Sequence, residues 1–115
     1  MTIKRHEPEK ILCNVVEGGG MVFTAGVTAD DLSQDVKGQT QQVLAKLDKL
    51  LAAGGSNKSK VLSATIWVTD IRNREAMNES YLKWADPKNM PARACVEAKL
   101  ADPRMLVEIA LIATK

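Results

Sequence analysis

The chain of 115 residues has few aromatic side chains: two tryptophans, one tyrosine and one phenylalanine. Proteins that stack on bases depend on such rings, and the formal net charge of +2 offers little attraction for a phosphate backbone. We therefore expect no nucleic acid among its partners. Because 45% of the residues are apolar and so few are aromatic, we expect a globular chain with an aliphatic core.

Metal-binding and disulfide patterns are also missing from the sequence. The two cysteines, Cys13 and Cys95, have no CxxC spacing, and His6 is the single histidine. This combination predicts two free thiols in a reducing compartment. It predicts no metal site.

Long apolar runs are absent, so no segment is expected to cross a membrane. The stretch from Met1 to Pro8 lacks the apolar segment that is typical of a signal peptide. We therefore expect a soluble, cytoplasmic protein that does not bind membranes. The length is typical of one domain, so we interpret residues 1–115 as a single domain.

Apolar residues recur at helical spacing in two stretches. The first runs from Gln34 to Ala53 and the second from about Asn73 to Trp84. Alternation or short apolar runs predict strands at residues 10–16, 21–27, 61–69, 92–98 and 105–113, with residues 2–5 as a further edge strand. This order predicts an α+β fold, in which a mixed, mostly antiparallel sheet of five to six strands carries two helices on one face.

The predicted strands differ in how many of their faces are apolar. In residues 61–69, alternation places Leu62 and Ile66 together on one face. Residues 105–113 are apolar on both faces except at Glu108, and such a strand is covered on both sides. Because the two helices occupy one face of the sheet, we infer that another copy of the protein covers the other.

Arg93 lies within a run of strand-forming residues. A charged guanidinium on a sheet face requires a carboxylate partner. If the alanines on either side of Arg93 face the helices, Arg93 and Cys95 face the other side, because side chains alternate along a strand. The same alternation in the last strand predicts that Glu108 shares this oligomer-facing surface with Arg93.

Two interpretations of this pair are open. In the structural one, Arg93 and Glu108 form a buried ion pair that fixes the oligomer. In the functional one, Arg93 holds a ligand carboxylate through both arms of its guanidinium, and Glu108 acts as an acid or base or orients water. The spacing of the two residues is compatible with both interpretations.

Two segments resemble the RidA/YjgF family of imine deaminases: Pro91-Ala92-Arg93-Ala94-Cys95-Val96-Glu97 and Val107-Glu108-Ile109. The segment Gly20-Met21-Val22-Phe23-Thr24-Ala25-Gly26 is similar to the second-strand motif of that family, and Met77-Asn78-Glu79-Ser80-Tyr81 to its second-helix motif. The resemblance extends over nearly the whole chain. It implies a homotrimer of chorismate-mutase-like subunits, with clefts between the subunits.

The resemblance also implies roles for individual residues. Arg93 matches the arginine that binds the substrate carboxylate, and Glu108 matches the glutamate that positions the attacking water. Cys95 matches a cysteine that lines the cleft, and Asn78 matches a residue near the site. Ala25 stands where the family has a serine, and we include it in the substrate-binding set.

A second departure from the family pattern lies in the first strand. Leu12 or Cys13 stands where the archetype has a tyrosine, so the chain is similar to a branch that keeps the arginine and varies the pocket. The implied reaction is hydrolysis of a 2-imino or enamine acid, such as 2-aminoacrylate or 2-iminobutyrate, to a 2-keto acid and ammonia without a cofactor. The alternatives are a non-catalytic trimer that binds small carboxylates in the same cleft, and a chaperone-like trimer.

Overall fold

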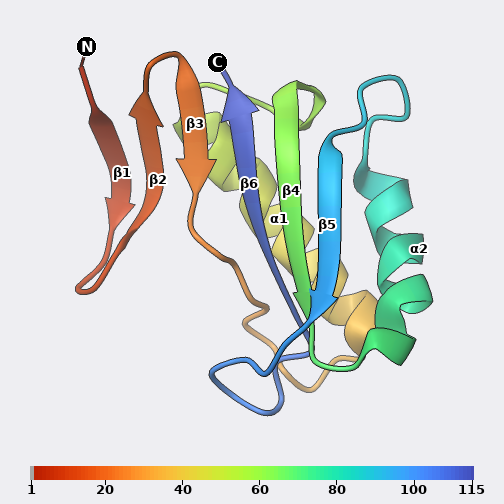
Figure 1. Ribbon diagram of the computed structural model, residues 1–115. Coiled ribbons are helices and arrows are strands. Elements are labelled where there is room, and N and C mark those ends of the chain that lie inside the picture. Colours follow the sequence, from red (N-terminus) through yellow and green to blue (C-terminus); the bar gives the residue numbers. More distant parts are fainter. Residues whose placement is uncertain (1) are drawn as a thin grey trace.

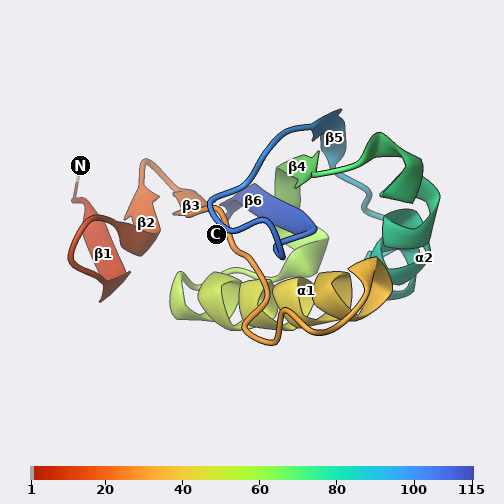
Figure 2. The ribbon, with the colours of Figure 1, turned by 90° about the horizontal axis from the view of Figure 1, so that it is seen from below.

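A computed structural model describes residues 2–115 of the chain. The single sheet has six strands: β1 (Lys4–Pro8), β2 (Cys13–Gly18), β3 (Met21–Thr24), β4 (Val61–Val68), β5 (Ala92–Glu97) and β6 (Val107–Thr114). Two helices, α1 (Val36–Ala53) and α2 (Arg74–Trp84), lie on one side of the sheet (Figure 2). Short 3₁₀ turns, η1 (Lys58–Lys60) and η2 (Ile71–Asn73), precede β4 and α2. The predicted α+β fold is confirmed.

The strands are arranged in the order β1-β2-β3-β6-β4-β5, so the last strand of the chain lies near the centre of the sheet (Figure 1). Every neighbouring pair is antiparallel except β4 and β5, which are parallel and are connected through α2. The sheet is therefore mixed and mostly antiparallel, as predicted. It has two edges, formed by β1 and β5.

Helix α1 begins at Val36 because Asp35 caps it. The Asp35 carboxylate accepts a hydrogen bond from the backbone N–H of Gly38 at 2.9 Å, which satisfies one of the free donors of the first turn. The helix therefore starts two residues after the predicted Gln34. It ends before Gly54, where a Cβ atom would lie 2.5 Å from a methyl carbon of Val22 on β3. The close approach of helix and sheet here requires a glycine.

The core lies between the helices and the sheet, and it is almost entirely aliphatic. The prediction that Leu62 shares a face with Ile66 is wrong: Ile66 is buried and Leu62 is 48% exposed, whereas Val61 is 5% exposed. The register of β4 against β6 shifts between Val61 and Ser63, and this bulge places Val61 on the inner side. Beyond the bulge, the alternation of β4 follows the prediction, with Ile66 fully buried.

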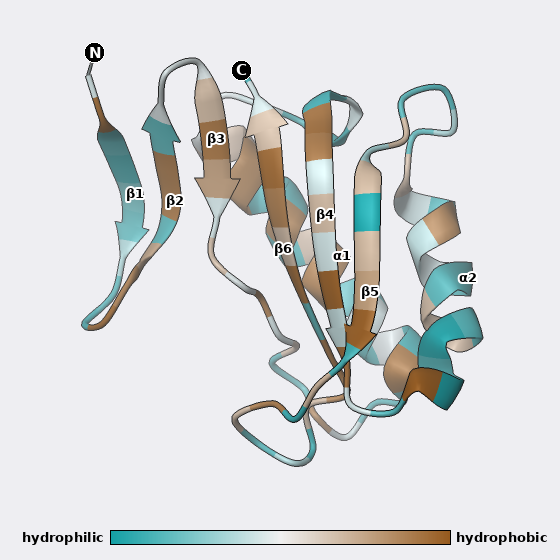
Figure 3. Ribbon diagram, viewed as in Figure 1, coloured by the Kyte–Doolittle hydropathy of each residue, from teal (hydrophilic) through white to brown (hydrophobic). Residues whose placement is uncertain are grey.

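The face of the sheet opposite the helices carries exposed apolar side chains. We call it the open face; Figure 3 views the sheet from this side, with α1 behind it. Phe23, Val96 and Ile112 remain 41%, 47% and 36% exposed. Within residues 2–115, neither helix has the length and apolarity of a membrane span.

Candidate functional site

Arg93 lies on the helix side of the sheet, so the predicted orientation of β5 is wrong. In the register of β4 and β5, Arg93 pairs with Ala64 and Cys95 pairs with Ile66. Ala64 and Ile66 are 1% and 0% exposed, and side chains in register share a face. Alternation correctly divided the side chains of β5 into two sets, one with Arg93 and Cys95 and one with the alanines and Val96. It could not tell which set faces the helices, and the set with Val96 is the exposed one.

Two side chains from α2 hold the guanidinium of Arg93. Its Nη1 donates a hydrogen bond to Oδ1 of Asn78 at 2.8 Å. Its Cζ lies 4.9 Å from the ring centroid of Tyr81, which is within the range of a cation–π contact. Asn78 and Tyr81 are three residues apart on a helix and so project from the same face. The neutral amide and the ring stabilise the charge without neutralising it.

A cavity of about 270 Å³ opens beside this guanidinium, between α2 and the segment that enters β5. We call it the Arg93 groove. It is lined by Asn78, Tyr81, Leu82, Met90, Pro91 and Arg93. Of the five N–H donors of a guanidinium, one is bonded to Asn78, so the other four are available to a ligand. A half-buried arginine with free donors is suited to a carboxylate, which it binds through two parallel hydrogen bonds.

Tyr81 forms the inner wall of the groove. It is 2% exposed, and its hydroxyl is the one buried side-chain oxygen or nitrogen in the described residues without a hydrogen-bond partner. Burial raises the pKa of Tyr81 above its usual value of 10.0, and the positive charge of Arg93 opposes this shift. The phenol is therefore neutral at physiological pH.

Glu108 lies on the open face, opposite Arg93. It follows buried Val107 and precedes buried Ile109 on β6, and it pairs in register with Trp67 of β4. Within residues 2–115 no salt bridge joins it to Arg93. The prediction that both share one surface of a single chain is therefore wrong, and a joint site or an ion pair between them requires two chains.

The segment after β3 lies directly beside Glu108. Val27 forms an isolated bridge with Ile109, donating at 2.9 Å and accepting at 3.1 Å, which keeps this segment along β6. A Cβ atom at Gly26 would lie 3.0 Å from Cδ of Glu108, so the carboxylate occupies the space that a side chain would fill. Ala25 precedes Gly26 in this segment. The structure thus brings Gly26 against Glu108, and it brings Asn78 and Arg93 together elsewhere.

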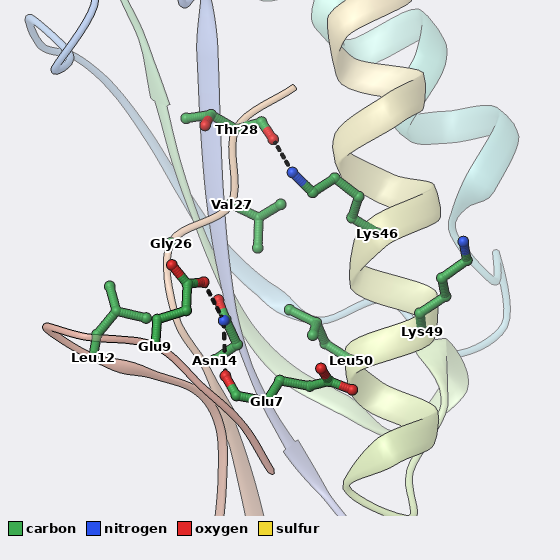
Figure 4. Close-up of a pocket in the computed structure, with 10 residues that line it drawn as sticks. All are labelled: Glu7, Glu9, Leu12, Asn14, Gly26, Val27, Thr28, Lys46, Lys49 and Leu50. Atoms are coloured by element: carbon green, nitrogen blue, oxygen red, sulfur yellow. Dashed lines mark hydrogen bonds between the residues drawn. The ribbon is translucent and has the colours of Figure 1, made fainter. Parts of the chain in front are cut away.

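A larger cavity of about 470 Å³ was not expected from the sequence. It lies between the turn joining β1 to β2 and the helix α1 (Figure 4). It is lined by Glu7, Glu9, Leu12, Asn14, Gly26, Val27, Thr28, Lys46, Lys49 and Leu50. It shares no residue with the Arg93 groove. Gly26 belongs to its wall and also contacts Glu108, so the cavity borders the Glu108 half of the candidate site.

Hydrogen bonds hold the walls of this larger cavity. Asn14 donates to the backbone carbonyl of Glu7 at 2.9 Å and also to the carboxylate of Glu9 (Figure 4). Lys46 donates to the carbonyl of Thr28 at 2.8 Å. The lining residues come from three separate segments, residues 7–14, 26–28 and 46–50, and no sequence pattern connects them. The positive φ of Glu7, 53°, which shapes the turn, also has no sequence signal.

Both cysteines are free thiols, as predicted. Cys13 donates from Sγ to the backbone carbonyl of His6 at 2.9 Å. Cys95 is half-buried against the core, two residues after Arg93 on the same face. No group of three or more His, Cys, Asp or Glu side chains in the described part of the chain is placed to hold a metal ion.

Comparison with known proteins places this fold and these motifs in one family. The family model described as Endoribonuclease L-PSP matches residues 2–115. A RutC family protein of Haemophilus influenzae is 42% identical over 115 residues, which cover 99% of each chain. This chain belongs to the YjgF/RidA family. The RutC family protein YoaB of Escherichia coli, a further relative, is 36% identical over 113 residues, or 98% of each chain.

Solved structures of the YjgF/RidA family share the fold. The crystal structure of NMB1025 from Neisseria meningitidis, a member of the YjgF protein family, matches with a TM-score of 0.97 and 36% identity. The match covers 100% of this chain and 96% of that one. An uncharacterised protein from Pseudomonas aeruginosa matches with a TM-score of 0.94 and 34% identity over 99% of both chains.

Proposed function

We propose that this YjgF/RidA-family protein hydrolyses reactive 2-imino acids and their enamine tautomers to 2-keto acids and ammonia. The observation that carries the proposal is the guanidinium of Arg93, which two side chains of α2 hold at the wall of a small groove with four N–H donors unused. Such an arrangement is suited to a small carboxylate. The family resemblance then supplies the reaction class.

We further propose that the site forms between subunits of a homotrimer. Arg93 and Glu108 lie on opposite faces of the sheet, so one chain alone cannot place both beside the same ligand. The apolar side chains on the open face favour its burial against a second copy. A ring in which the Glu108 face of each subunit meets the groove of the next would complete three equal sites.

In this site, Arg93 binds the carboxylate and fixes the imine carbon near the partner's Glu108. The carboxylate of Glu108 accepts a proton from water as the water oxygen bonds to the imine carbon, and a proton passes to the imine nitrogen. Glu108 then returns its proton to the amino nitrogen of the resulting carbinolamine and accepts the proton of the carbinolamine hydroxyl as the carbon–nitrogen bond breaks, which releases ammonia and leaves the keto acid. Cys95 and Asn78 shape the Arg93 side of the site, and Ala25 shapes the Glu108 side.

A binding role without catalysis is the second candidate. At the two positions where the resemblance implies a tyrosine and a serine, this chain has Leu12 or Cys13 and Ala25, none of which provides a hydroxyl. A pocket with fewer polar groups holds water less firmly, which favours retention of a ligand over its hydrolysis.

The matching family description also names an endoribonuclease, so RNA is included as a substrate in the experiment below.

The test measures keto acid formation from imines generated in situ by a threonine or serine dehydratase, with semicarbazide competing for the imine. We expect Arg93→Ala to lower kcat/KM by about 100-fold, because two charge-assisted hydrogen bonds to the substrate are lost. We expect the kcat/KM of Arg93→Lys to lie between those of the wild type and Arg93→Ala, since lysine keeps the charge and loses the planar fork of the guanidinium. The matched control is Arg104→Ala, which removes a surface arginine that is paired with Asp102.

Each outcome assigns a function. Full turnover by Arg93→Ala would show that the carboxylate clamp is wrong. If the wild type hydrolyses no imine but binds 2-keto acids in a way that depends on Arg93, the protein is a carboxylate-binding module. Cleavage of single-stranded RNA that survives Arg93→Ala would place a nuclease activity outside this groove.

A further inference from the structure

The charge of Arg93 is held in one orientation by two different contacts. The hydrogen bond to Asn78 fixes one nitrogen of the guanidinium but leaves the group free to rotate about that bond. Cζ of the guanidinium lies over the ring of Tyr81, 4.9 Å from the ring centroid, so the ring makes a second contact with the group. With both contacts in place, the free donors point in a fixed direction.

Tyr81 is itself rigidly placed. Its side chain is 2% exposed, and its ring packs against Trp84 with centroids 6.0 Å apart and planes inclined by 48°. The hydroxyl contributes no hydrogen bond to this packing. A buried hydroxyl without a hydrogen-bond partner lowers the stability of the protein. The favourable contacts of Tyr81 in the groove are therefore those of its ring.

We propose that Tyr81 is a positioning residue for Arg93, and that its ring holds the guanidinium plane in the orientation in which it binds a carboxylate. The inference rests on the proposed function of Arg93 as a carboxylate clamp. It extends that function by assigning to α2 the side chain that orients the guanidinium of Arg93 before a ligand binds. Tyr81 acts through Arg93 and needs no contact with the substrate.

The experiment compares Tyr81→Phe, which keeps the ring, with Tyr81→Leu, which removes it. Trp84→Leu is the control. It removes a large ring from the same helix, and this ring packs on Tyr81 but not on Arg93. We expect Tyr81→Leu to raise KM, and the Kd of a 2-keto acid, about tenfold with kcat within about twofold. Tyr81→Phe should bind as the wild type does and unfold at an equal or higher temperature, because it lacks the unpaired hydroxyl.

The Nε–H signal of Arg93 in a ¹⁵N-arginine-labelled sample gives a readout that does not depend on turnover. In the wild type and in Tyr81→Phe, we expect a ring-shifted, ordered signal for Arg93. In Tyr81→Leu, we expect a signal near the random-coil position, while Trp84→Leu should retain the ring shift.

Three results would overturn the inference. Wild-type KM and Kd in Tyr81→Leu would show that the ring does not position the clamp. An equal loss in Trp84→Leu would show that only the packing of α2 matters, and an equal loss in Tyr81→Phe would assign the effect to the hydroxyl. If the wild type binds keto acids but hydrolyses no imine, the proposed enzyme activity fails while Kd and the Arg93 signal still decide the role of Tyr81.

Discussion

Gly26 lies against the carboxylate of Glu108, and a methyl group at position 26 would overlap it. We expect Gly26→Ala to push the Glu108 side chain out of place, because a flexible side chain yields more readily than the backbone. Glu108 is the proposed base, so kcat for imine hydrolysis should fall by about 10- to 100-fold while KM changes little.

The matched control for this prediction is Gly18→Ala on β2, the same substitution at a glycine where an added Cβ atom would meet no other atom closer than 3.8 Å. Circular dichroism should show that Gly26→Ala is folded. If Gly26→Ala had wild-type kcat, Glu108 would not act from the position it occupies in this structure.

Single residues of the site could be named from the sequence, but their partners could not. The motif around Arg93 and the one around Glu108 pointed to both residues. The contact between Arg93 and Tyr81 joins β5 to α2, and the helical spacing of residues 73–84 pairs Tyr81 with no charged group. Periodicity records which side of an element a residue occupies, and it does not record which charged group meets which ring across two elements.

Three elements of the sheet meet at one buried carboxylate, that of Glu17 on β2. It accepts from Nζ of Lys115, just beyond the end of β6, at 2.6 Å, and it also contacts Nε2 of His6 on β1. Lys115 first, and then His6, lower the pKa of Glu17 from its usual 4.5 to about 2. No sequence pattern indicates this cluster, because its members are distant along the chain.

The folded state therefore binds a proton at Glu17 less readily than the unfolded state does. Its contribution to stability is complete above pH 4.5 and is lost as the pH falls towards about 2. We expect the unfolding temperature to fall less between about pH 6 and about pH 3 in Glu17→Gln than in the wild type, at equal protein concentration. Glu75→Gln, which changes an exposed carboxylate, should follow the wild type. Parallel curves for Glu17→Gln and the wild type would contradict the assignment.

At the scale of elements, the sequence predicted the type of nearly every segment and erred where a local irregularity decides the outcome. The bulge in β4 exchanges the burial of Val61 and Leu62, because one extra residue reverses the alternation. The orientation of β5 was also wrong. Its alanines are small enough for either face, so the contacts of Arg93 with α2 decide the orientation.

For the whole molecule, the open face is the surface on which the proposed trimer depends. Val96 is 47% exposed there and pairs in register with Trp67. We expect Val96→Asp to convert a trimer into monomers, because the interface would bury an unpaired charge. Size-exclusion chromatography with light scattering measures this directly. Ile71→Asp, at an exposed apolar position outside the sheet, should remain trimeric. A monomeric wild type would contradict the proposed assembly.

The central position of β6 has a consequence for synthesis on the ribosome. Until residues 107–114 leave the exit tunnel, β3 and β4 have no neighbour to pair with on their facing edges. The nascent chain then consists of a hairpin-like half and a half that contains both helices, each with an open strand edge that favours aggregation. The sheet is completed only when β6 inserts between the two halves.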